Sequence, residues 1–528
     1  MTIKETYLDP AEKNPIKQNS VSRQLLEYAS NRPAASILDF AGNGDGTTDN
    51  TNALTKAFGS GAAEIYIPQG TFLLSSTVLI PAAVRRFGGS GTILWGGAAS
   101  NVPVVYTDGT DALEIYGLTF NAPRAAGGPY CIGIFDGTAT TKNLYIHDIR
   151  FVHAGSRAIY GICTDANSNN FIIENIRVDD FDVGAIALTS LGDIAVRNSQ
   201  LVGDGAATGH CLALQTTGKV TITGNYVYKH HGLFGIVVSD AGPGTLISNN
   251  NVIDGGVDCI SINADTADVS DFAISNNIIA NPTVTPLDLG IGINALPNRT
   301  ISRGTVKGNY IRNRWHGAVV LAAVNGAGTV KSIEVADNFC IDPYLHDVAG
   351  NAAIVLQSDG AVGGIVGTAL EPNIVRNNWI ISTDGVLKYA VAETTADGTV
   401  DYTVCGDNFV KGEATGLYRL VGAHSVSGMP EVRPSATTKT TNYTLTDNDA
   451  ELIFNAGATA VVTLQSAANY PGRVLHIKTV AAQAVQSSTT NVVALASTTA
   501  STAILTATAG KWARLKSDGT QWVIMASN

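Results

Sequence analysis

A short apolar segment interrupted by one turn residue recurs along most of this chain. Eleven copies lie between residues 113 and 410, and each places Gly, Asn or Asp at the turn. These three residues adopt a left-handed backbone most easily. Successive turn residues are 23 to 40 residues apart, and a repeat of this length is typical of a solenoid. The turn residues are Gly117, Asp148, Asn175, Asn198, Gly224, Asn249, Asn276, Gly308, Asp337, Asn377 and Asp407.

Each repeat also contains a further apolar strand, such as GAIALTS at 184–190 and CISINAD at 259–265. A strand, a one-residue bend, a second strand, a variable loop and a third strand make one coil of a parallel β-helix. Coils of this kind stack at the spacing of neighbouring strands, about 4.8 Å. We therefore predict an all-β chain built on a right-handed parallel β-helix with three strands per coil.

The composition agrees with this fold and excludes some partners. Charged residues make up 15% of the chain, which is below the usual share of about 25%. The formal net charge of −11 argues against nucleic acid as a partner. No apolar run is long enough to cross a membrane, so we expect no membrane insertion. The six cysteines lack ligand spacing, and we predict buried thiols, no metal and no cofactor.

The N-terminal part predicts a cap on the β-helix. Residues 1–35 are polar, with a short helical pattern at 20–30, and we expect a connector or cap there. A strand and a Gly/Asp turn follow, and a short helix is predicted to begin after Thr48 or Asp49. This helix would cover the open edge of the first coil, and the β-helix would extend over 36–424. Its inward residues are Ala53, Leu54, Ala57 and Phe58.

The C-terminal part changes pattern. Pro, Ser and Thr cluster over 425–441, which predicts a linker. Beyond it, residues 442–528 alternate apolar and polar side chains with period two, which predicts a small antiparallel, sandwich-like β domain. Trp512 and Trp522 are either core residues or platforms for a sugar ring.

Residues 39–80 carry a family resemblance. DFAGNGDGTTDNTNAL and EIYIPQGTFLLSSTVLI resemble the N-terminal signature of pectate-lyase-superfamily β-helices, especially bacteriophage tailspikes. SVSRQLLEYAS at 20–30 is similar to a segment that often precedes the helix in tailspikes. Residues 442–528 resemble C-terminal modules of phage tail proteins, which serve in trimerisation or glycan binding.

The resemblance implies a homotrimeric protein of the virion, made in the host cytoplasm and acting at the bacterial cell surface. Its N-terminus would attach to the phage tail or baseplate. Proteins of this family bind, and usually cleave, host surface polysaccharide such as capsule or O-antigen.

The loops that precede the third strand of each coil form the face that we predict to be functional. Acidic, basic and aromatic residues concentrate in them. Glycoside hydrolysis needs two carboxyl groups, about 5–5.5 Å apart for retention and about 6.5–9.5 Å apart for inversion. One or two coil steps supply these separations, and we expect inversion. The candidate catalytic residues are Asp204, Asp254 and Asp258.

Further residues on the same loops are candidates for support and substrate binding. His210 and His231 would orient or protonate a reacting group. An aromatic side chain and a guanidinium suit a subsite for an acidic sugar. Two more acids, Asp182 and Asp288, flank the candidate catalytic residues. The candidate substrate-binding residues are Lys229, Arg314, Trp315, His316 and Tyr344.

Asp258 has a narrower resemblance in its favour. GVDCISIN at 256–263 is similar to the polygalacturonase motif Asp-Asp-Cys-Ile-Ala-Ile-Asn, in which both acids are catalytic. Asp258 matches the second acid, but Val257 replaces the first. A second carboxylate must therefore come from another position, such as Asp204 or Asp254.

Three functions remain open from the sequence. The first is a tailspike that depolymerises bacterial surface polysaccharide by glycoside hydrolysis with paired carboxylates. The second is a polysaccharide lyase, in which Lys229, His231 or Arg314 removes a proton next to a uronate carboxylate. The third is a tail protein that binds a glycan receptor without cleaving it.

Overall fold

The chain divides into two compact units, Met1–Ile278 and Ile279–Asn528. The predicted helical pattern at 20–30 lies outside the described residues. The computed structural model describes residues 34–98, 101–123, 127–137, 139–165, 167–203, 209–230, 233–255, 257–280, 289–314, 316–324, 326–343, 352–359, 364–383, 385–395, 399–412, 415–427, 437–446 and 449–528.

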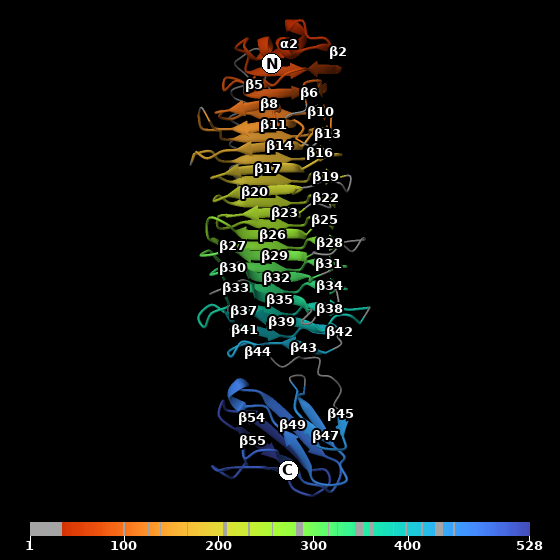
Figure 1. The fold of residues 1–528 in the computed structure, drawn as a ribbon, viewed down its shortest axis with the longest axis vertical. Helices are drawn as coiled ribbons and strands as arrows, with labels where there is room; N and C mark the ends of the chain where they lie inside the picture. Colours follow the sequence, from red (N-terminus) through yellow and green to blue (C-terminus); the bar gives the residue numbers. More distant parts are fainter. Residues whose placement is uncertain are drawn as a thin grey trace, which may run out of the picture. The chain divides into compact units, whose positions relative to one another are not determined.

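Over the described residues, the fold is an all-β parallel solenoid of about 16 turns, with one α-helix near its start and a C-terminal mixed-sheet domain. Within each unit the chain visits three parallel sheets in a repeating order, which we call the first, second and third sheets. Figure 1 shows the strands of each sheet stacked one above another. The prediction of a parallel β-helix with three strands per coil is confirmed.

In the first unit the three sheets contain the following strands. The first sheet has β1 (Ala34–Ser36), β3 (Glu64–Ile67), β6 (Arg86–Gly89), β9 (Glu114–Tyr116), β12 (Leu144–His147), β15 (Phe171–Glu174), β18 (Ile194–Arg197), β21 (Val220–Thr223), β24 (Leu246–Ser248) and β27 (Val269–Ser275). The second sheet has β2 (Asp45–Asp49), β4 (Thr71–Leu74), β7 (Thr92–Trp95), β10 (Thr119–Ala122), β13 (Arg150–Ala154), β16 (Arg177–Val178), β19 (Gln200–Val202), β22 (Tyr226–His230) and β25 (Asn251–Gly255). The third sheet has β5 (Val78–Ile80), β8 (Pro103–Asp108), β11 (Tyr130–Phe135), β14 (Arg157–Ile162), β17 (Gly184–Ser190), β20 (Leu212–Thr216), β23 (Phe234–Ser239) and β26 (Asp258–Ala264).

The second unit repeats the pattern, and the division between the units falls within β28 (Ile278–Ala280) of the second sheet. The first sheet has β30 (Thr300–Lys307), β33 (Thr329–Ala336), β36 (Ile365–Val366), β37 (Asn373–Arg376), β40 (Thr399–Val400), β41 (Thr403–Gly406) and β44 (Val426–Ser427). The second sheet has β31 (Tyr310–Arg312), β34 (Phe339–Ile341), β38 (Trp379–Ile381) and β42 (Phe409–Lys411). The third sheet has β29 (Leu289–Ala295), β32 (Val319–Val324), β35 (Ala352–Asp359), β39 (Tyr389–Thr395) and β43 (Gly416–Arg419).

The turn residues behave as the sequence predicts. All eleven have a positive φ, between 48° at Asn198 and 70° at Gly117 and Gly224. A residue with a Cβ atom pays a steric cost in this conformation, and Asn, Asp and Gly pay the least. Two residues before the turn the side chain points inward, and Ile115 and Ile222 are fully buried. The repeat therefore fixes both the bend and the core of every coil.

A column of buried asparagines follows the turns. In the first unit, Asn225 Nδ2 donates to Asn250 Oδ1 at 3.0 Å, and Asn250 Nδ2 donates to Asn277 Oδ1 at 3.0 Å. In the second unit, Asn338 Nδ2 donates to Asn378 Oδ1 at 2.9 Å. Each amide also bonds to backbone, as where Asn250 Nδ2 donates to the carbonyl of Ile222 at 3.0 Å. These amides satisfy one another along the stack, so they hold the coils in register.

The N-terminal end of the solenoid has a 3-10 helix, η1 (Ile37–Phe40), before β2 and an α-helix, α2 (Thr51–Phe58), after β2. The N-cap of α2 is Asn50, which makes no side-chain cap, whereas the sequence predicted Thr48 or Asp49. The side chain of Asn50 is committed to the preceding turn, where its Oδ1 accepts the Asn43 N–H at 2.6 Å. Asp49 still helps, because its Oδ1 accepts the Thr51 N–H at 3.0 Å. The buried face has the four residues that the sequence predicts.

The C-terminal strands form a mixed domain rather than an antiparallel one. Successive strands from β45 to β50 alternate between two sheets, so each pairs in parallel with the strand two places earlier. Period-two alternation cannot distinguish this winding from hairpins. One sheet has β45 (Thr437–Lys439), β47 (Glu451–Phe454), β49 (Val474–Thr479), β54 (Trp512–Ser517), β55 (Trp522–Ser527), β51 (Val492–Val493) and β52 (Ala500–Ser501). The other has β46 (Tyr443–Thr444), β48 (Ala460–Thr463), β50 (Val485–Ser487) and β53 (Ala503–Leu505), and η2 (Ala467–Asn469) follows β48.

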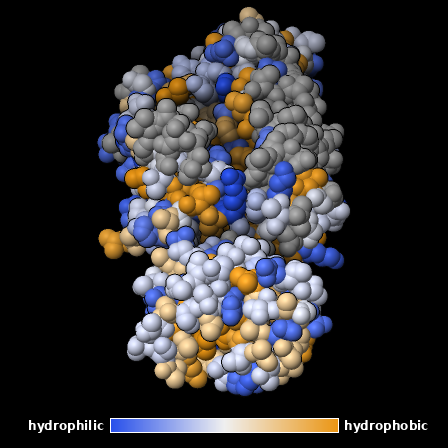
Figure 2. Space-filling view, turned by 60° about the horizontal axis from the view of Figure 1, so that its bottom comes forward, coloured by the Kyte–Doolittle hydropathy of each residue, from blue (hydrophilic) through white to orange (hydrophobic). Residues whose placement is uncertain are grey.

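The surface, the cysteines and the helix of the described residues complete the description of the fold. Figure 2 looks onto the C-terminal domain, whose visible face mixes hydrophobic and hydrophilic residues. All six cysteines are free and buried, as predicted. Within the part of the chain that the structure describes, no helix has the length and apolar character to span a membrane.

Candidate functional site

The loops that lead into the third sheet lie in register. The N–H of Val183 donates to the carbonyl of Ser156 at 2.9 Å, and the N–H of Gly209 donates to the carbonyl of Val183 at 3.1 Å. Side chains follow the same order, since His153 Nδ1 lies 3.2 Å from Asp180 Oδ2 on the next coil. Residues more than 20 positions apart in the chain are therefore neighbours along this side of the first unit.

Two of the predicted catalytic acids lie on one coil. Asp254 belongs to β25 and Asp258 begins β26, and the two side chains are 6% and 3% exposed. Asp254 has a left-handed backbone, with φ of 58°, where the chain turns from the second sheet toward the third. Asp258 pairs with Phe234 on the preceding coil. Asp182 is partly exposed, and its N–H donates to the carbonyl of Gly155 at 3.1 Å.

Several predicted site residues lie outside the described residues, or have a side chain that does. These are Asp204, His231, Asp288, Trp315, Tyr344 and the side chain of Lys229. Their predicted roles remain predictions.

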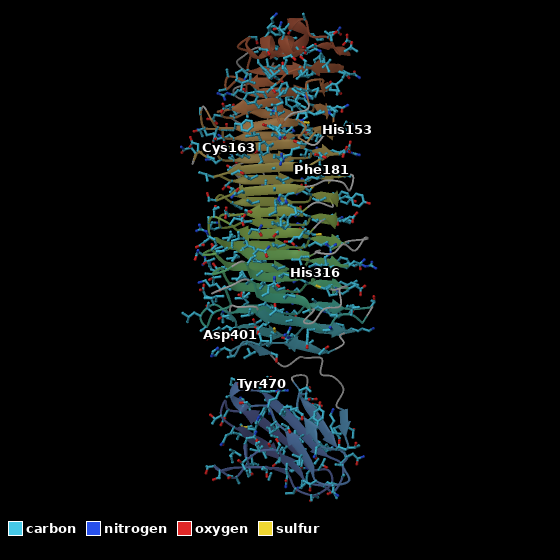
Figure 3. All side chains as sticks on the ribbon, in the orientation of Figure 1. His153, Cys163, Phe181, His316, Asp401 and Tyr470 are labelled. Atoms are coloured by element: carbon cyan, nitrogen blue, oxygen red, sulfur yellow. The ribbon has the colours of Figure 1, made fainter. Side chains whose placement is uncertain are left out.

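Arg314 and His316 precede β32 in the second unit. Arg314 is fully buried, and its Nε donates to the carbonyl of Asn313 at 3.1 Å. Its Nη1 also reaches the carbonyl of Leu289 at 3.5 Å. A guanidinium used in this way holds loop backbone in place, which argues for a structural role over the predicted contact with a sugar. His316 is partly exposed (Figure 3).

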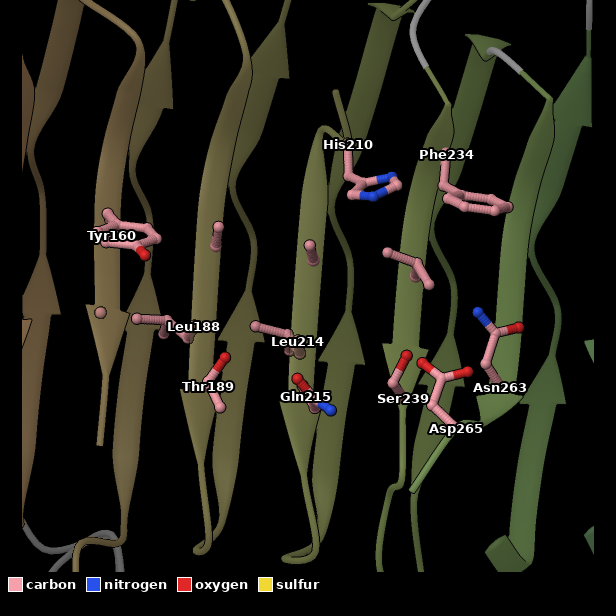
Figure 4. A pocket seen from close by; sticks show the side chains of 14 residues that line it. Tyr160, Leu188, Thr189, His210, Leu214, Gln215, Phe234, Ser239, Asn263 and Asp265 are labelled. Carbon is pink, nitrogen blue, oxygen red and sulfur yellow. The ribbon is translucent and has the colours of Figure 1, made fainter. Parts of the chain in front are cut away.

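A groove of about 330 Å³ crosses five strands of the third sheet in the first unit, namely β14, β17, β20, β23 and β26. Figure 4 shows its lining side chains on these neighbouring strands. Four strand steps of about 4.8 Å give the groove a length of about 19 Å. An extended chain molecule therefore fits along it better than a compact one.

The outward positions of these strands make the floor of the groove. Tyr160, Ala187, Ala213 and Val237 are successive partners in the sheet register. Two small side chains in the middle leave the backbone close to the surface, with Tyr160 standing at one end. The groove is hollow because the sequence places alanine where the pleat points outward.

The two edges of the groove differ in chemistry. At the starts of the strands, the rings of His210 and Phe234 stack with centroids 4.9 Å apart (Figure 4). At the ends of the strands, polar residues line the opposite edge. These are Thr189, Gln215, Ser239 and Asn263, which are successive register partners, and Asp265.

His210 is held as a neutral ring. Burial lowers the pKa of His210, and the nearby positive charge of Arg157 lowers it further. Its Nδ1 is buried and has no hydrogen-bond partner among the described residues. A proton on Nδ1 would be a buried donor without a described acceptor, whereas a proton on Nε2 leaves only an unpaired acceptor, which costs less, so the Nε2 tautomer is favoured. His210 can therefore donate a hydrogen bond from Nε2.

Most polar groups of the groove are open. Among the described residues, the side chains of Thr189, Ser239, Asp265 and Tyr160 make no hydrogen bond, although the N–H of Asp265 donates to Asp240 Oδ1 at 2.8 Å. Gln215 and Asn263 differ, because Gln215 Nε2 donates to Asp240 at 3.0 Å and Asn263 Oδ1 accepts from Ser261 Oγ at 2.9 Å. Open groups along one line are available to the hydroxyls of a ligand.

The first sheet of the same unit carries polar residues that are paired with one another. Arg86 Nε donates to Glu114 Oε2 at 2.6 Å, and Arg86 Nη1 donates to Glu64 Oε1 at 3.1 Å. The ring of His147 lies between two carboxylates, with Nε2 at 2.9 Å from Glu114 and Nδ1 at 2.7 Å from Asp148. This outer face is a closed network.

The groove residues on strands were missed by sequence reasoning, which searched the loops. A signal exists, because the residue directly after the buried Leu188, Leu214, Val238 and Ile262 is polar in four successive coils. It is Thr189, Gln215, Ser239 or Asn263. In the described part of the chain, His, Cys, Asp and Glu do not gather in any group of three or more suited to a metal ion.

Comparison with known proteins supports the fold. Residues 34–107 match the family described as rhamnogalacturonase A/epimerase, pectate lyase-like. This match confirms the resemblance to pectate-lyase-superfamily β-helices that residues 39–80 predict. A curated relative, plasmin and fibronectin-binding protein A of Streptococcus pneumoniae, is 26% identical over 216 residues. That match covers 38% of this chain and only 28% of the relative's length.

Solved structures include similar solenoids. A tailspike protein of E. coli bacteriophage HK620, solved in complex with a hexasaccharide, has a TM-score of 0.51 and 13% identity, and covers 77% of this chain and 81% of its own. The A-module of mannuronan C-5 epimerase AlgE4 from Azotobacter vinelandii has a TM-score of 0.48 and 16% identity, and covers 75% of this chain and 100% of its own. At these identities the likeness to the tailspike concerns the fold alone.

Proposed function

We propose that this protein is a phage tailspike that binds bacterial surface polysaccharide, capsule or O-antigen, and shortens it by glycoside hydrolysis. In this proposal the protein is a homotrimer of the virion, and residues 1–35 attach it to the tail or baseplate. Residues 36–424 form the catalytic β-helix, 425–441 a linker and 442–528 a domain for trimerisation or glycan binding.

The observation that carries the proposal is the groove on the third sheet. It is long, with small side chains in the middle of its floor, and three side chains of its polar edge, Thr189, Ser239 and Asp265, make no hydrogen bond to another described residue. Sugars need this combination, because their rings present apolar faces to aromatic side chains and hydroxyls to hydrogen-bonding groups. The HK620 tailspike, a solenoid of similar fold, was solved with a hexasaccharide.

Asp258 is the acid that we place nearest the reaction. It follows the stacked pair of His210 and Phe234 along the same edge, because Phe234 is its register partner. One carboxyl group would give its proton to the leaving glycosidic oxygen, while a second carboxylate takes a proton from the attacking water. Asp254 on the same coil and Asp204 two coils earlier are the candidates for the second role.

His210 is proposed to orient the substrate in this reaction. A neutral ring with its proton on Nε2 donates to a sugar oxygen without adding a positive charge beside the reacting acids. Lys229, His231, Asp182 and Asp288 retain their predicted supporting roles in this proposal.

The test uses purified protein and polysaccharide from candidate host bacteria. Chain length is followed by size-exclusion chromatography, new reducing ends by a colorimetric assay, and double bonds by ultraviolet absorbance. We expect shorter chains with new reducing ends and no new absorbance. Asp258→Asn should lower the rate by about 10²- to 10⁴-fold while binding is retained, and unchanged activity would remove Asp258 from the mechanism.

A binding protein without cleavage is the second candidate. The near-complete burial of Asp254 and Asp258 favours it, because a catalytic carboxyl must reach its substrate. Binding of the polysaccharide without any change in the length of its chains would support this second function. New ultraviolet absorbance would instead select a lyase.

A further inference from the structure

The outer face of the seven-stranded sheet in the C-terminal domain is distinct in charge. The inner face of this sheet packs into the domain core, where Leu475, Ile477, Ala513 and Leu515 are buried. Side chains alternate along each strand, so the residues between these point away from the core. Those outward residues on β49 and β54 are His476, Lys478, Trp512, Arg514 and Lys516.

These outward residues place cations beside one another. His476 lies directly opposite Arg514, and Lys478 lies opposite Trp512. Lys478, Arg514 and Lys516 are exposed. Like charges that lie near one another on one face repel, so the presence of three cations there needs an explanation.

Neighbouring acidic residues do not explain why these cations lie together. Across the described residues, the side chains of Lys478, Arg514 and Lys516 have neither an ion pair nor a hydrogen bond. Glu451, opposite His476, is the one acidic residue in β47, β49 and β54. Residues 437–528 contain six Lys and Arg against four Asp and Glu, a net charge of +2, whereas the whole chain carries −11.

The two tryptophans of this domain separate the roles that the sequence left open. Trp522 is fully buried, and its Nε1–H donates to the carbonyl of Gln465 at 2.9 Å, so it is a core residue. Trp512 is 37% exposed on the basic face. An exposed indole beside cations offers a sugar ring an apolar surface and its acidic groups a countercharge.

We propose that this basic face, formed by Lys478, Arg514, Lys516 and Trp512, binds an acidic polysaccharide through its carboxylate or phosphate groups. Arg514 would take a carboxylate or phosphate through two N–H groups, and the lysines would hold neighbouring acidic groups of the polymer. The choice of a polysaccharide as partner rests on the proposed function, and the choice of an acidic one rests on this face. The exposed indole of Trp512 beside these cations favours a sugar polymer, and binding of nucleic acid or an anionic membrane instead is an outcome of the test.

The test measures binding of the full-length chain to immobilised polygalacturonate, with neutral dextran, phosphatidylglycerol vesicles and double-stranded DNA as comparisons. The variant Lys478→Glu/Arg514→Glu/Lys516→Glu is compared with Lys56→Glu/Lys411→Glu/Arg419→Glu, which changes three exposed residues of the solenoid by the same charge. Both are made in an Ala213→Trp background, which fills the groove. A Gln version of the first triple keeps the test valid if charge reversal impairs folding.

We expect the first triple to lose at least about tenfold in affinity for polygalacturonate, and the control triple to lose much less. Salt should weaken binding of the parent protein more than binding of the first triple. Trp512→Ala should weaken binding without changing the salt dependence. Equal losses in the two triples would overturn the proposal, because net charge alone would explain them.

Binding of vesicles or DNA through this face without binding of polygalacturonate would also overturn it. A failure of the basic-face proposal says nothing against the groove proposal, because Ala213→Trp blocks the groove in every protein of this test. Failure of the groove proposal is read separately, from the chain-length assay on proteins with Ala213 intact.

Discussion

The first and third sheets of residues 34–278 both carry polar and aromatic side chains outward, but they use them differently. On the first sheet Arg86, Glu114 and His147 are hydrogen-bonded to one another and to neighbouring acids. On the third sheet the side chains of Thr189 and Ser239, and that of Asp265 directly after β26, make no hydrogen bond to another described residue. The polar side chains of the first sheet bond to one another, whereas those of the third sheet remain available to a ligand.

This difference has a physical meaning. A paired network gains stability from contacts within the protein, whereas an unpaired polar group at the bottom of a groove keeps its hydrogen bonds for water or a ligand. Changes to the first sheet should therefore affect stability, and changes to the groove should affect binding.

Filling the floor of the groove should have the largest effect. Ala213→Trp places an indole where the ligand would lie, and we expect polysaccharide affinity to fall by at least about 100-fold. Thr221→Trp is the matched control, because it lies on β21 of the first sheet, directly after β20 in the chain. Titration by calorimetry measures both. Equal affinities of the two variants for polysaccharide would contradict the claim that the third sheet, and not the first, binds the ligand.

Removing a paired amide should cost stability instead. In Asn250→Ala, the N–H and Nδ2 of Asn225 both lose the Oδ1 that they bind at 3.0 Å. Each buried group left without a partner costs about 1–3 kcal/mol, and we expect a loss of at least about 2 kcal/mol in urea unfolding. Affinity of the folded protein for polysaccharide should not change. A stability loss below about 0.5 kcal/mol would argue against the role of the asparagine column.

Removing hydroxyl groups of the groove should lower the affinity for polysaccharide and leave the stability unchanged, with a smaller effect in free energy. Thr189→Val with Ser239→Ala removes two hydroxyls that have no hydrogen-bond partner among the described residues. A net hydrogen bond contributes about 0.5–1.5 kcal/mol, so affinity should fall by roughly 5- to 100-fold, while stability stays within about 0.5 kcal/mol. A stability loss without an affinity loss would show that these groups are structural.

The smallest effect concerns pH and the first sheet. Burial opposes the charged form of Glu114, but hydrogen bonds from His147 and Arg86 outweigh it and lower the Glu114 pKa below its ordinary value of 4.5. Burial likewise opposes charge on His147, but hydrogen bonds to Glu114 and Asp148 raise its pKa above 6.5.

The sign of the effect follows from these directions. The contribution of Glu114 is lost as pH falls through its lowered pKa, and that of His147 is lost as pH rises through its raised pKa. Their joint contribution is therefore fully present between about pH 4.5 and 6.5. His147→Gln should cost most stability in that window and less at about pH 8.5. Urea unfolding at both pH values checks this, and an equal cost at both would contradict it.

The sequence predicts the coils well because their physics is local. Asn198 and Asp148 adopt the left-handed turn that their residue types favour, and Ile222 is buried where the repeat places it. The cap on α2 was predicted less well, because Asn50 uses its side chain in a turn seven residues back.

The site was harder to predict because it depends on stacking. Asp258 could be chosen from its motif, but the groove arises where Ala187, Ala213 and Val237 from separate coils meet. Their outward direction follows from strand alternation, yet which columns are small and which are polar appears only after the coils are aligned. Burial is also hard to predict for single loop residues, since the charged Arg314 is fully buried.

The most direct test of the account is hydroxyl-radical footprinting of the protein with and without an oligosaccharide of its host polysaccharide. Tyr160 and Phe234 report on the groove, and Tyr116 and Tyr145 report on the first sheet of the same unit. The account predicts that the oligosaccharide protects Tyr160 and Phe234 and leaves the other two unchanged. Protection of Tyr116 and Tyr145 with no change in the groove would contradict it.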